Sequence, residues 1–137
     1  MNGRLKAARF LIGFGCFVML ASAALHLFAA YPRVSSPALT ASNLNAGLQA
    51  AFRTVFLMVG WDWIVLAAII LIAAFTDTRI RKTIVLICGF ALLVQTAVTV
   101  GFMRWFIGSE MLLAAALLIL SGGLLVPPPG IRGEAPR

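Results

Sequence analysis

Apolar residues occur in four long runs along this chain, and short polar segments separate them. The runs cover residues 8–30, 54–75, 83–103 and 109–126. A helix needs about 20 apolar residues to cross a hydrocarbon core about 30 Å thick, and each run is close to that length. The pattern therefore predicts an all-α membrane protein, with residues 1–126 forming one four-helix up-down transmembrane bundle. The Pro-rich end, residues 127–137, is predicted to be a disordered tail.

The longest interruption, residues 31–53, carries helical signals of its own. Ser36 followed by Pro37 is typical of a helix start, where a capping residue precedes a proline in the first turn. Apolar residues then recur at near-helical spacing, at Leu39, Leu44, Leu48 and Phe52. The segment is an outer loop that holds either a short amphipathic helix on the membrane surface or an N-terminal extension of the second helix.

The composition and the charge distribution support a membrane location and predict its direction. Charged residues make up 11% of the chain, against about 25% in soluble domains, and the mean hydropathy is +1.04. Eight basic residues flank one face of the predicted bundle, namely Arg4, Lys6, Arg9, Arg79, Arg81, Lys82, Arg132 and Arg137. Three flank the other face: Arg33, Arg53 and Arg104. Since Lys and Arg concentrate in cytoplasmic loops, both termini are predicted to be cytoplasmic.

The basic residues flank the apolar runs and form no separate patch, so membrane lipids rather than nucleic acid are the expected partners. Two Lys stand beside nine Arg, with abundant Ala and Leu. This composition indicates a bacterial source with a GC-rich genome. The predicted location is therefore the bacterial inner membrane.

Asp62 is the most unusual residue of the second run, where it stands in the stretch GWDWIVLAA. An Asp at the centre of a transmembrane helix costs about 2.5–3.5 kcal/mol, and each Leu, Ile, Phe or Val returns about 0.3–0.6 kcal/mol. The run has twelve such residues, so the helix still inserts. At 1.5 Å per residue, Asp62 and Gln95 both lie about 12 Å below the outer surface, and His26 lies about 6 Å below it.

The polar and aromatic side chains of the runs thus converge on the outer half of the predicted bundle. Ionisable residues inside a membrane usually face the bundle interior or a wet cavity, so this convergence is a candidate binding site. Asp62 has His26, Gln95 and Arg104 as candidate partners. The full candidate set is Asp62, His26, Gln95, Arg104, Trp61, Trp63, Trp105, Glu110 and Arg53.

Each of these residues also has a purely structural interpretation. The three tryptophans fit an interfacial aromatic belt as well as a pocket lining. Glu110 favours the start of the fourth helix, where a carboxylate stabilises the helix dipole. Arg53 and Arg104 fit end anchors, and His26 and Asp62 fit interhelical hydrogen bonds.

Motifs for most chemistry are absent from the sequence. It has no HExxH, no CxxC, no Gly-rich phosphate loop and no serine-nucleophile motif. One His cannot provide paired haem ligands, so no metal or cofactor is expected, although a quinone or lipid remains a candidate ligand. Cys16 and Cys88 fall inside the apolar runs and are expected to be buried thiols.

Two stretches resemble the DoxX-like group of small four-span bacterial membrane proteins. Residues 61–86, WDWIVLAAIILIAAFTDTRIRKTIVL, place an acid at the start of an aliphatic second span that ends at a Thr-Arg turn. Residues 101–120, GFMRWFIGSEMLLAAALLIL, are similar to the Arg-bearing close of the third span and the acid-led fourth span of a related branch. The resemblance implies the four-span architecture and, for some members of the group, a role as a subunit of membrane redox or stress-response complexes.

Three functions stay open on the sequence alone. The leading hypothesis is a non-enzymatic accessory or interaction subunit, whose outer-leaflet polar site binds a lipid-like or quinone-like molecule or a partner helix. The second is a small membrane enzyme acting on a lipophilic substrate, with Asp62 and His26 as acid and base. The third is a small oligomeric transporter coupled to protons through Asp62. Another membrane protein or a second copy of the chain is a candidate partner.

Overall fold

The computed structural model describes residues 3–76 and 80–127, and the regular secondary structure in these two ranges is entirely helical. The elements are α1 (Gly3–Leu25), η1 (His26–Ser35), α2 (Ser36–Thr40), α3 (Ala46–Phe75), α4 (Arg81–Met103) and α5 (Ile107–Leu125). Because α1, η1 and α2 follow one another without a break, they form one of four helical units that are long and apolar enough to cross a membrane. The predicted all-helical class with four such helices is confirmed, as expected for a multi-pass membrane protein.

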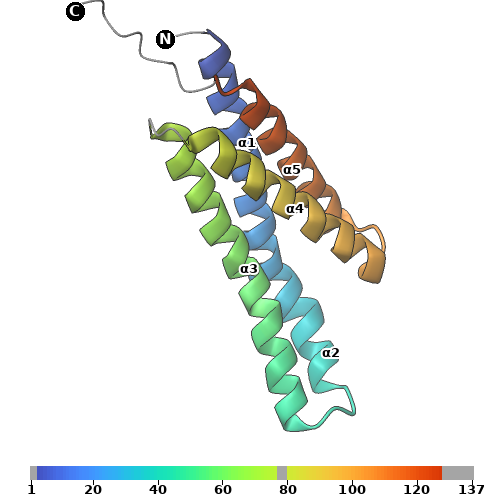
Figure 1. The fold of residues 1–137 in the computed structure, drawn as a ribbon. Helices are drawn as coiled ribbons and strands as arrows, with labels where there is room; N and C mark the ends of the chain where they lie inside the picture. Colours follow the sequence, from blue (N-terminus) through green and yellow to red (C-terminus); the bar gives the residue numbers. More distant parts are fainter. Residues whose placement is uncertain (1–2, 77–79, 128–137) are drawn as a thin grey trace, which may run out of the picture.

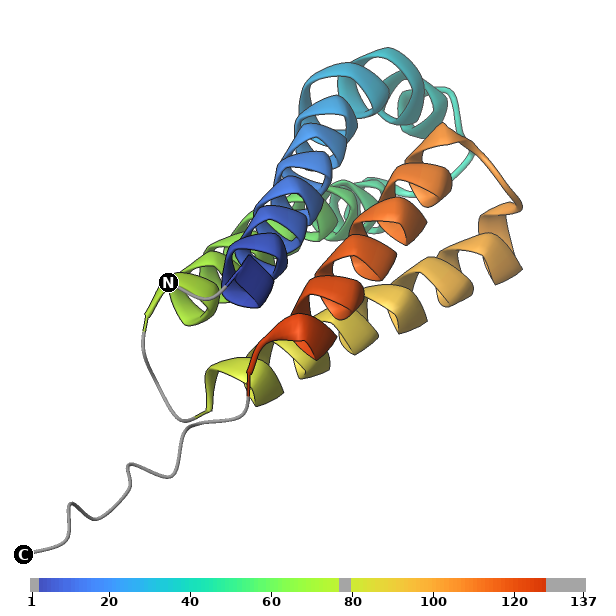
Figure 2. The same cartoon turned by 90° about the horizontal axis from the view of Figure 1, so that it is seen from above.

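The four long helices pack side by side (Figure 1). α1 packs against both α5 and α3, α4 packs against α5, and a smaller contact joins α3 to α4. Figure 2 shows α5 lying between α1 and α4. The beginning of α1 and the end of α5 lie at the same end of the molecule, and the α4–α5 turn lies at the opposite end (Figure 1). We call the latter the outer end.

Residues 31–53 differ from the predicted outer loop, because most of them are helical. The first helix continues through Pro32, which lies inside the π-helix η1. A proline has no N–H to donate and would end an ordinary α-helix. In η1 the turns are wider, and the N–H of Ser36 bonds the carbonyl of Tyr31, five residues back. Such local π adjustments let a transmembrane helix tolerate proline, which is why the chain does not turn at this residue.

The second helix also begins earlier than its apolar run. α3 starts at Ala46, after Asn45, whose side chain accepts a hydrogen bond of 2.9 Å from the N–H of Leu48. Residues 46–53 are therefore an N-terminal extension of the second helix, whereas residues 31–40 continue the first. With 30 residues α3 is about 45 Å long, whereas α5, with 19, is about 28 Å long. The hairpin of α2 and the first turns of α3 consequently projects beyond the α4–α5 turn (Figure 1).

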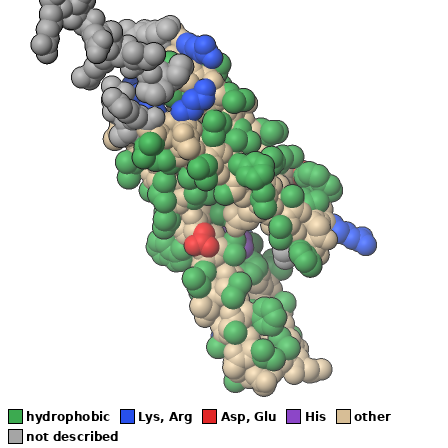
Figure 3. All heavy atoms as spheres, in the orientation of Figure 1, with side chains coloured by type: hydrophobic (Ala, Val, Ile, Leu, Met, Phe, Trp, Pro, Cys, Tyr) green, Lys and Arg blue, Asp and Glu red, His purple; other side chains and the backbone are tan. Residues whose placement is uncertain are grey.

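The surface is apolar over most of its length, as a lipid-facing protein requires. Figure 3 shows hydrophobic side chains over the helices, with Lys and Arg gathered at the end where α1 begins and an isolated basic side chain at the α4–α5 turn. On this face an acidic side chain lies among the hydrophobic ones on α3. Large side chains such as Phe10, Phe17 and Ile72 are more than 60% exposed.

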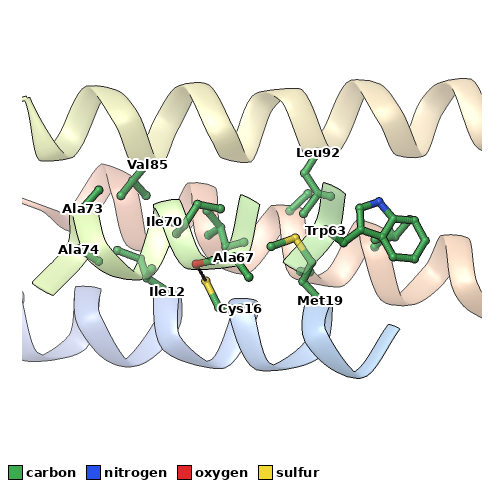
Figure 4. Close-up of a cluster of buried hydrophobic side chains, with 14 of the residues drawn as sticks. Ile12, Cys16, Met19, Trp63, Ala67, Ile70, Ala73, Ala74, Val85 and Leu92 are labelled. Carbon is green, nitrogen blue, oxygen red and sulfur yellow. Dashed lines mark hydrogen bonds between the residues drawn. The ribbon is translucent and has the colours of Figure 1, made fainter. Parts of the chain in front are cut away.

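The core combines large side chains such as Met19, Trp63 and Leu92 with alanines (Figure 4), and glycines beside it allow the helices to approach closely. A Cβ added at Gly15 would lie 3.1 Å from the carbonyl oxygen of Ala115, and one added at Gly122 would lie 2.9 Å from that of Ala8. The thiol of Cys16 is buried and donates to the carbonyl of Ala67 at 3.9 Å, and Cys88 is half-buried, so neither forms a disulfide. Close backbone approach of this kind drives helix association where there is no hydrophobic effect.

These contacts also fix which residues share a level along the bundle. Gly15 packs against Ala115 and Ile119 across the α1–α5 interface, and Gly89 packs against Ile119 and Leu120 across the α4–α5 interface. On the other side of α1, the Cys16–Ala67 and His26–Phe56 hydrogen bonds set the register of α1 against α3. Since neighbouring helices are antiparallel, levels elsewhere follow by counting 1.5 Å per residue.

Candidate functional site: the α3–α4 seam

An apolar groove runs between α3 and α4 at the inner end, on the side of the molecule opposite the α4–α5 turn. It has a volume of about 250 Å³ and is lined by Ile69, Ile72, Ala73, Thr76, Ile80 and Ile84. Its position follows from the packing, because α3 and α4 make the smallest contact of the four neighbouring pairs. We call the line along which these two helices face each other the α3–α4 seam.

Two polar side chains flank the same seam closer to the outer end. Asp62 precedes Ile69 by seven residues and Ala73 by eleven, so it lies within about 20° of both around the axis of α3. Gln95 follows Ile84 by eleven residues and lies within about 20° of it on α4. Asp62 and Gln95 therefore lie on the same helix faces as residues that line the groove, further toward the outer end.

Trp63 and these two polar residues lie at one level. Counting from the interhelical contacts described above puts Asp62, Trp63 and Gln95 within about one helical turn of each other. The same count puts Asp62 about 6 Å below the start of α5. Asp62 is thus nearer to the level of the α4–α5 turn than a count from Thr54 suggests, because α3 extends past that turn.

Trp63 carries a buried hydrogen-bond donor that has no acceptor among the described residues. Its side chain is only 6% exposed, and its Nε1 has no hydrogen-bond partner within the two described ranges. Figure 4 shows the ring nitrogen on the side of the indole that faces α4. A buried donor left unpaired costs about 1–3 kcal/mol. An acceptor placed in the seam beside Trp63 would remove that cost.

His26, in contrast, is satisfied within the bundle. Its Nε2 lies 2.8 Å from the carbonyl oxygen of Phe56, and since a carbonyl only accepts, Nε2 carries the proton. The imidazole stacks on the Phe56 ring at 4.1 Å and meets the edge of Trp63 at 5.2 Å. Tyr31 lies 5.8 Å from Phe56 on the same side. His26 therefore fixes the position of Trp63 and the entry to η1.

Asp62 lies on the outward face of α3 and is exposed. That face is a continuous exposed stripe of eight residues: Val55, Met58, Trp61, Asp62, Val65, Ala68, Ile69 and Ile72. Asp62 is the one polar member of the stripe. No hydrogen bond or ion pair joins it to His26, Gln95, Arg104 or any other described residue. The structure does not bring Asp62 and His26 into the contact that a shared proton transfer needs.

The other candidate residues lie away from the seam or at its rim. Trp61 and Trp105 are each 60% exposed, so the three tryptophans do not line a common pocket. Arg53 donates to the Thr40 hydroxyl at 3.0 Å and ties α3 to α2 in the projecting hairpin. Exposed side chains of Arg104, at the end of α4, and Glu110, in the first turn of α5, border the outer end.

Sequence reasoning missed two parts of this arrangement. The distinction between Trp63 and Trp61 is visible in the sequence, because Trp63 shares a helical face with the small or buried residues Ala67, Ile70 and Ala74. The stacking of Phe56 on His26 has no sequence signal, since it depends on the register of two helices. Within the described ranges, no group of three His, Cys, Asp or Glu residues could hold a metal ion.

Comparison of the chain with family models, with curated proteins and with solved structures finds no match.

Proposed function

We propose that this chain is a non-enzymatic protein of a bacterial inner membrane that binds a lipid-like amphiphile along the outer half of the α3–α4 seam. The observation that carries the proposal is the unpaired, buried indole N–H of Trp63, which faces α4 about 9 Å outward along α3 from Ile69, the nearest residue of the apolar groove. A binding site of this kind is mostly apolar with a few placed polar groups. The seam has that composition, with the Gln95 amide and the Asp62 carboxylate beside Trp63.

The proposed topology is an up-down bundle with both termini in the cytoplasm. Arg4, Lys6 and Arg9 at the start of α1 and Arg81 and Lys82 at the start of α4 support it, because basic residues favour the cytoplasmic side. The seam site then belongs to the outer leaflet. Fusing a periplasm-dependent reporter to the α4–α5 turn, and separately to the C-terminus, tests the orientation: activity only at the turn is expected.

The resemblance to the DoxX-like group extends the proposal to an accessory role. Small four-span proteins of that group include subunits of larger membrane complexes. A bound amphiphile would then serve as structural lipid or as a carried molecule for a partner.

Native mass spectrometry of the gently solubilised protein tests the binding. Wild type and Trp61→Phe are expected to retain a bound amphiphile, whereas Trp63→Phe removes the N–H and is expected to lose it. Trp61 is the matched control, because it is the neighbouring indole but is exposed. A thermal melt of each variant separates loss of ligand from loss of fold. Equal occupancy in all three folded proteins, or no bound molecule in wild type, would refute the proposal.

A further inference from the structure

We infer that the amphiphile in the seam is a phospholipid with a primary ammonium headgroup, of the phosphatidylethanolamine type, recognised by Asp62. The inference rests on the proposed function and adds the headgroup class to it. Asp62 is exposed at the rim of the seam, and its carboxylate has no partner among residues 3–76 and 80–127. What it lacks is a donor with a positive charge.

The described part of the protein does not supply such a donor at this level. Arg104 follows Gln95 by nine residues on α4, which places its backbone about 14 Å further out. Arg53 is bonded to Thr40 in the projecting hairpin. His26 is bonded to Phe56 on the other side of Trp63.

The position of Asp62 suits a lipid headgroup. It lies about 6 Å below the start of α5, near the boundary between headgroups and hydrocarbon. An ammonium group has three N–H donors and makes charge-assisted bonds to a carboxylate. A choline headgroup has the same charge without these donors, and a glycerol headgroup leaves the phosphate charge unopposed against Asp62.

The rest of such a lipid would lie along α3 and α4 below Asp62. The partly exposed Gln95 amide can donate to the ester oxygens of the glycerol backbone, and the Trp63 N–H, which side chains cover in the structure, can donate once the lipid displaces them. From Gln95 to Ile84 is eleven residues, so an acyl chain would run about 16 Å along apolar side chains before reaching the inner groove. That groove, lined by Ile72 and Ala73 on α3, is apolar apart from Thr76.

The test titrates delipidated protein with dioleoyl phosphatidylethanolamine, and in parallel with the phosphatidylcholine and phosphatidylglycerol of the same chains, by native mass spectrometry. Wild type is expected to bind the ethanolamine lipid about tenfold more tightly than the choline lipid, the size of one charge-assisted hydrogen bond. Asp62→Asn should abolish this preference while retaining binding. Glu110→Gln, which removes another exposed carboxylate near the same level on α5, should leave the preference unchanged.

The outcomes distinguish failure of the headgroup assignment from failure of the proposed binding. Binding that depends on Trp63 but shows no headgroup preference, or a preference that survives Asp62→Asn, would overturn the inference and leave the proposed function intact. Trp63-independent binding of all three lipids would overturn the proposed function as well.

Discussion

Gly122 on α5 is the position where one added methyl group should harm this fold most clearly. A Cβ there would lie 2.6 Å from Cγ1 of Ile12, 2.9 Å from the carbonyl oxygen of Ala8 and 3.1 Å from the backbone nitrogen of Ile12. The Ile12 side chain can turn away, but the two backbone atoms can move only if α1 shifts as a whole. Gly122→Ala therefore has to separate α1 from α5.

The expected loss combines two opposing terms. Replacing Gly by Ala inside a helix favours the folded state by about 1 kcal/mol, but overpacking a well-filled interface costs about 1–3 kcal/mol and sometimes more. The α1–α5 interface is the most extensive in the molecule, so separating it also loses dispersion contacts along both helices. We expect Gly122→Ala to lower the free energy of unfolding by about 1–2 kcal/mol.

Gly13 is the matched control, because a Cβ added there meets nothing within 4 Å. Gly13→Ala carries the helix-propensity gain without the clash and should leave stability unchanged or raise it by up to about 1 kcal/mol. Both variants and wild type would be unfolded reversibly in mixed micelles by increasing SDS, with helicity followed by circular dichroism. Equal midpoints for the two variants, or a Gly122→Ala variant as stable as wild type, would show that α1 and α5 do not pack in this register.

Three further substitutions test local features, each by the same unfolding assay. Arg104 has φ 63° and ψ −176°, a backbone conformation that costs about 1–3 kcal/mol for a residue with a side chain. Arg104→Gly should therefore raise the free energy of unfolding, and Arg104→Ala should not. Asn45→Ala removes the cap of α3 and should lower the free energy of unfolding by about 1 kcal/mol, whereas Asn45→Asp should lower it only slightly. Equal decreases for the two variants would contradict the capping geometry. His26→Phe keeps the stacking on Phe56 but removes the 2.8 Å hydrogen bond, so it should lower the free energy of unfolding by about 1 kcal/mol. An unchanged free energy of unfolding would show that this bond is not formed in the membrane.

The number and kind of the long helices could be predicted because bilayer thickness fixes the length of an apolar run. Their ends could not be predicted in the same way. Tyr31-Pro32 indicates a turn when read locally, but the structure keeps the helix going through the wide turns of η1. The early start of α3 is set by Asn45, one of several polar residues in the segment that could have capped a helix.

The common level of Asp62 and Gln95 could be predicted, but neither the depth of Asp62 nor the contacts of the candidate residues could. Counting along the runs placed Asp62 and Gln95 at a common depth, and the register of the helices agrees. Which side chains meet depends on the rotation of each helix about its own axis. That rotation turns Trp63 inward and its neighbour Trp61 outward, and it directs His26 to a backbone carbonyl rather than to a carboxylate.

The contrast between hydrogen-bonded and unpaired polar side chains is the main support for the proposal that an amphiphile binds at the α3–α4 seam. A bilayer provides no hydrogen bonds, so transmembrane polar side chains are expected to find partners inside the protein. Several described ones do: Thr96 and Thr99 bond carbonyls of their own helix, Ser109 bonds Phe106, and His26 bonds Phe56. The Trp63 indole, the Gln95 amide and the Asp62 carboxylate form no bond to another described residue. Arg53 Nε in the projecting hairpin is also buried without a partner in the described part of the chain, but the Trp63, Asp62 and Gln95 groups lie at one level on α3 and α4, where a single amphiphilic molecule could bond more than one of them.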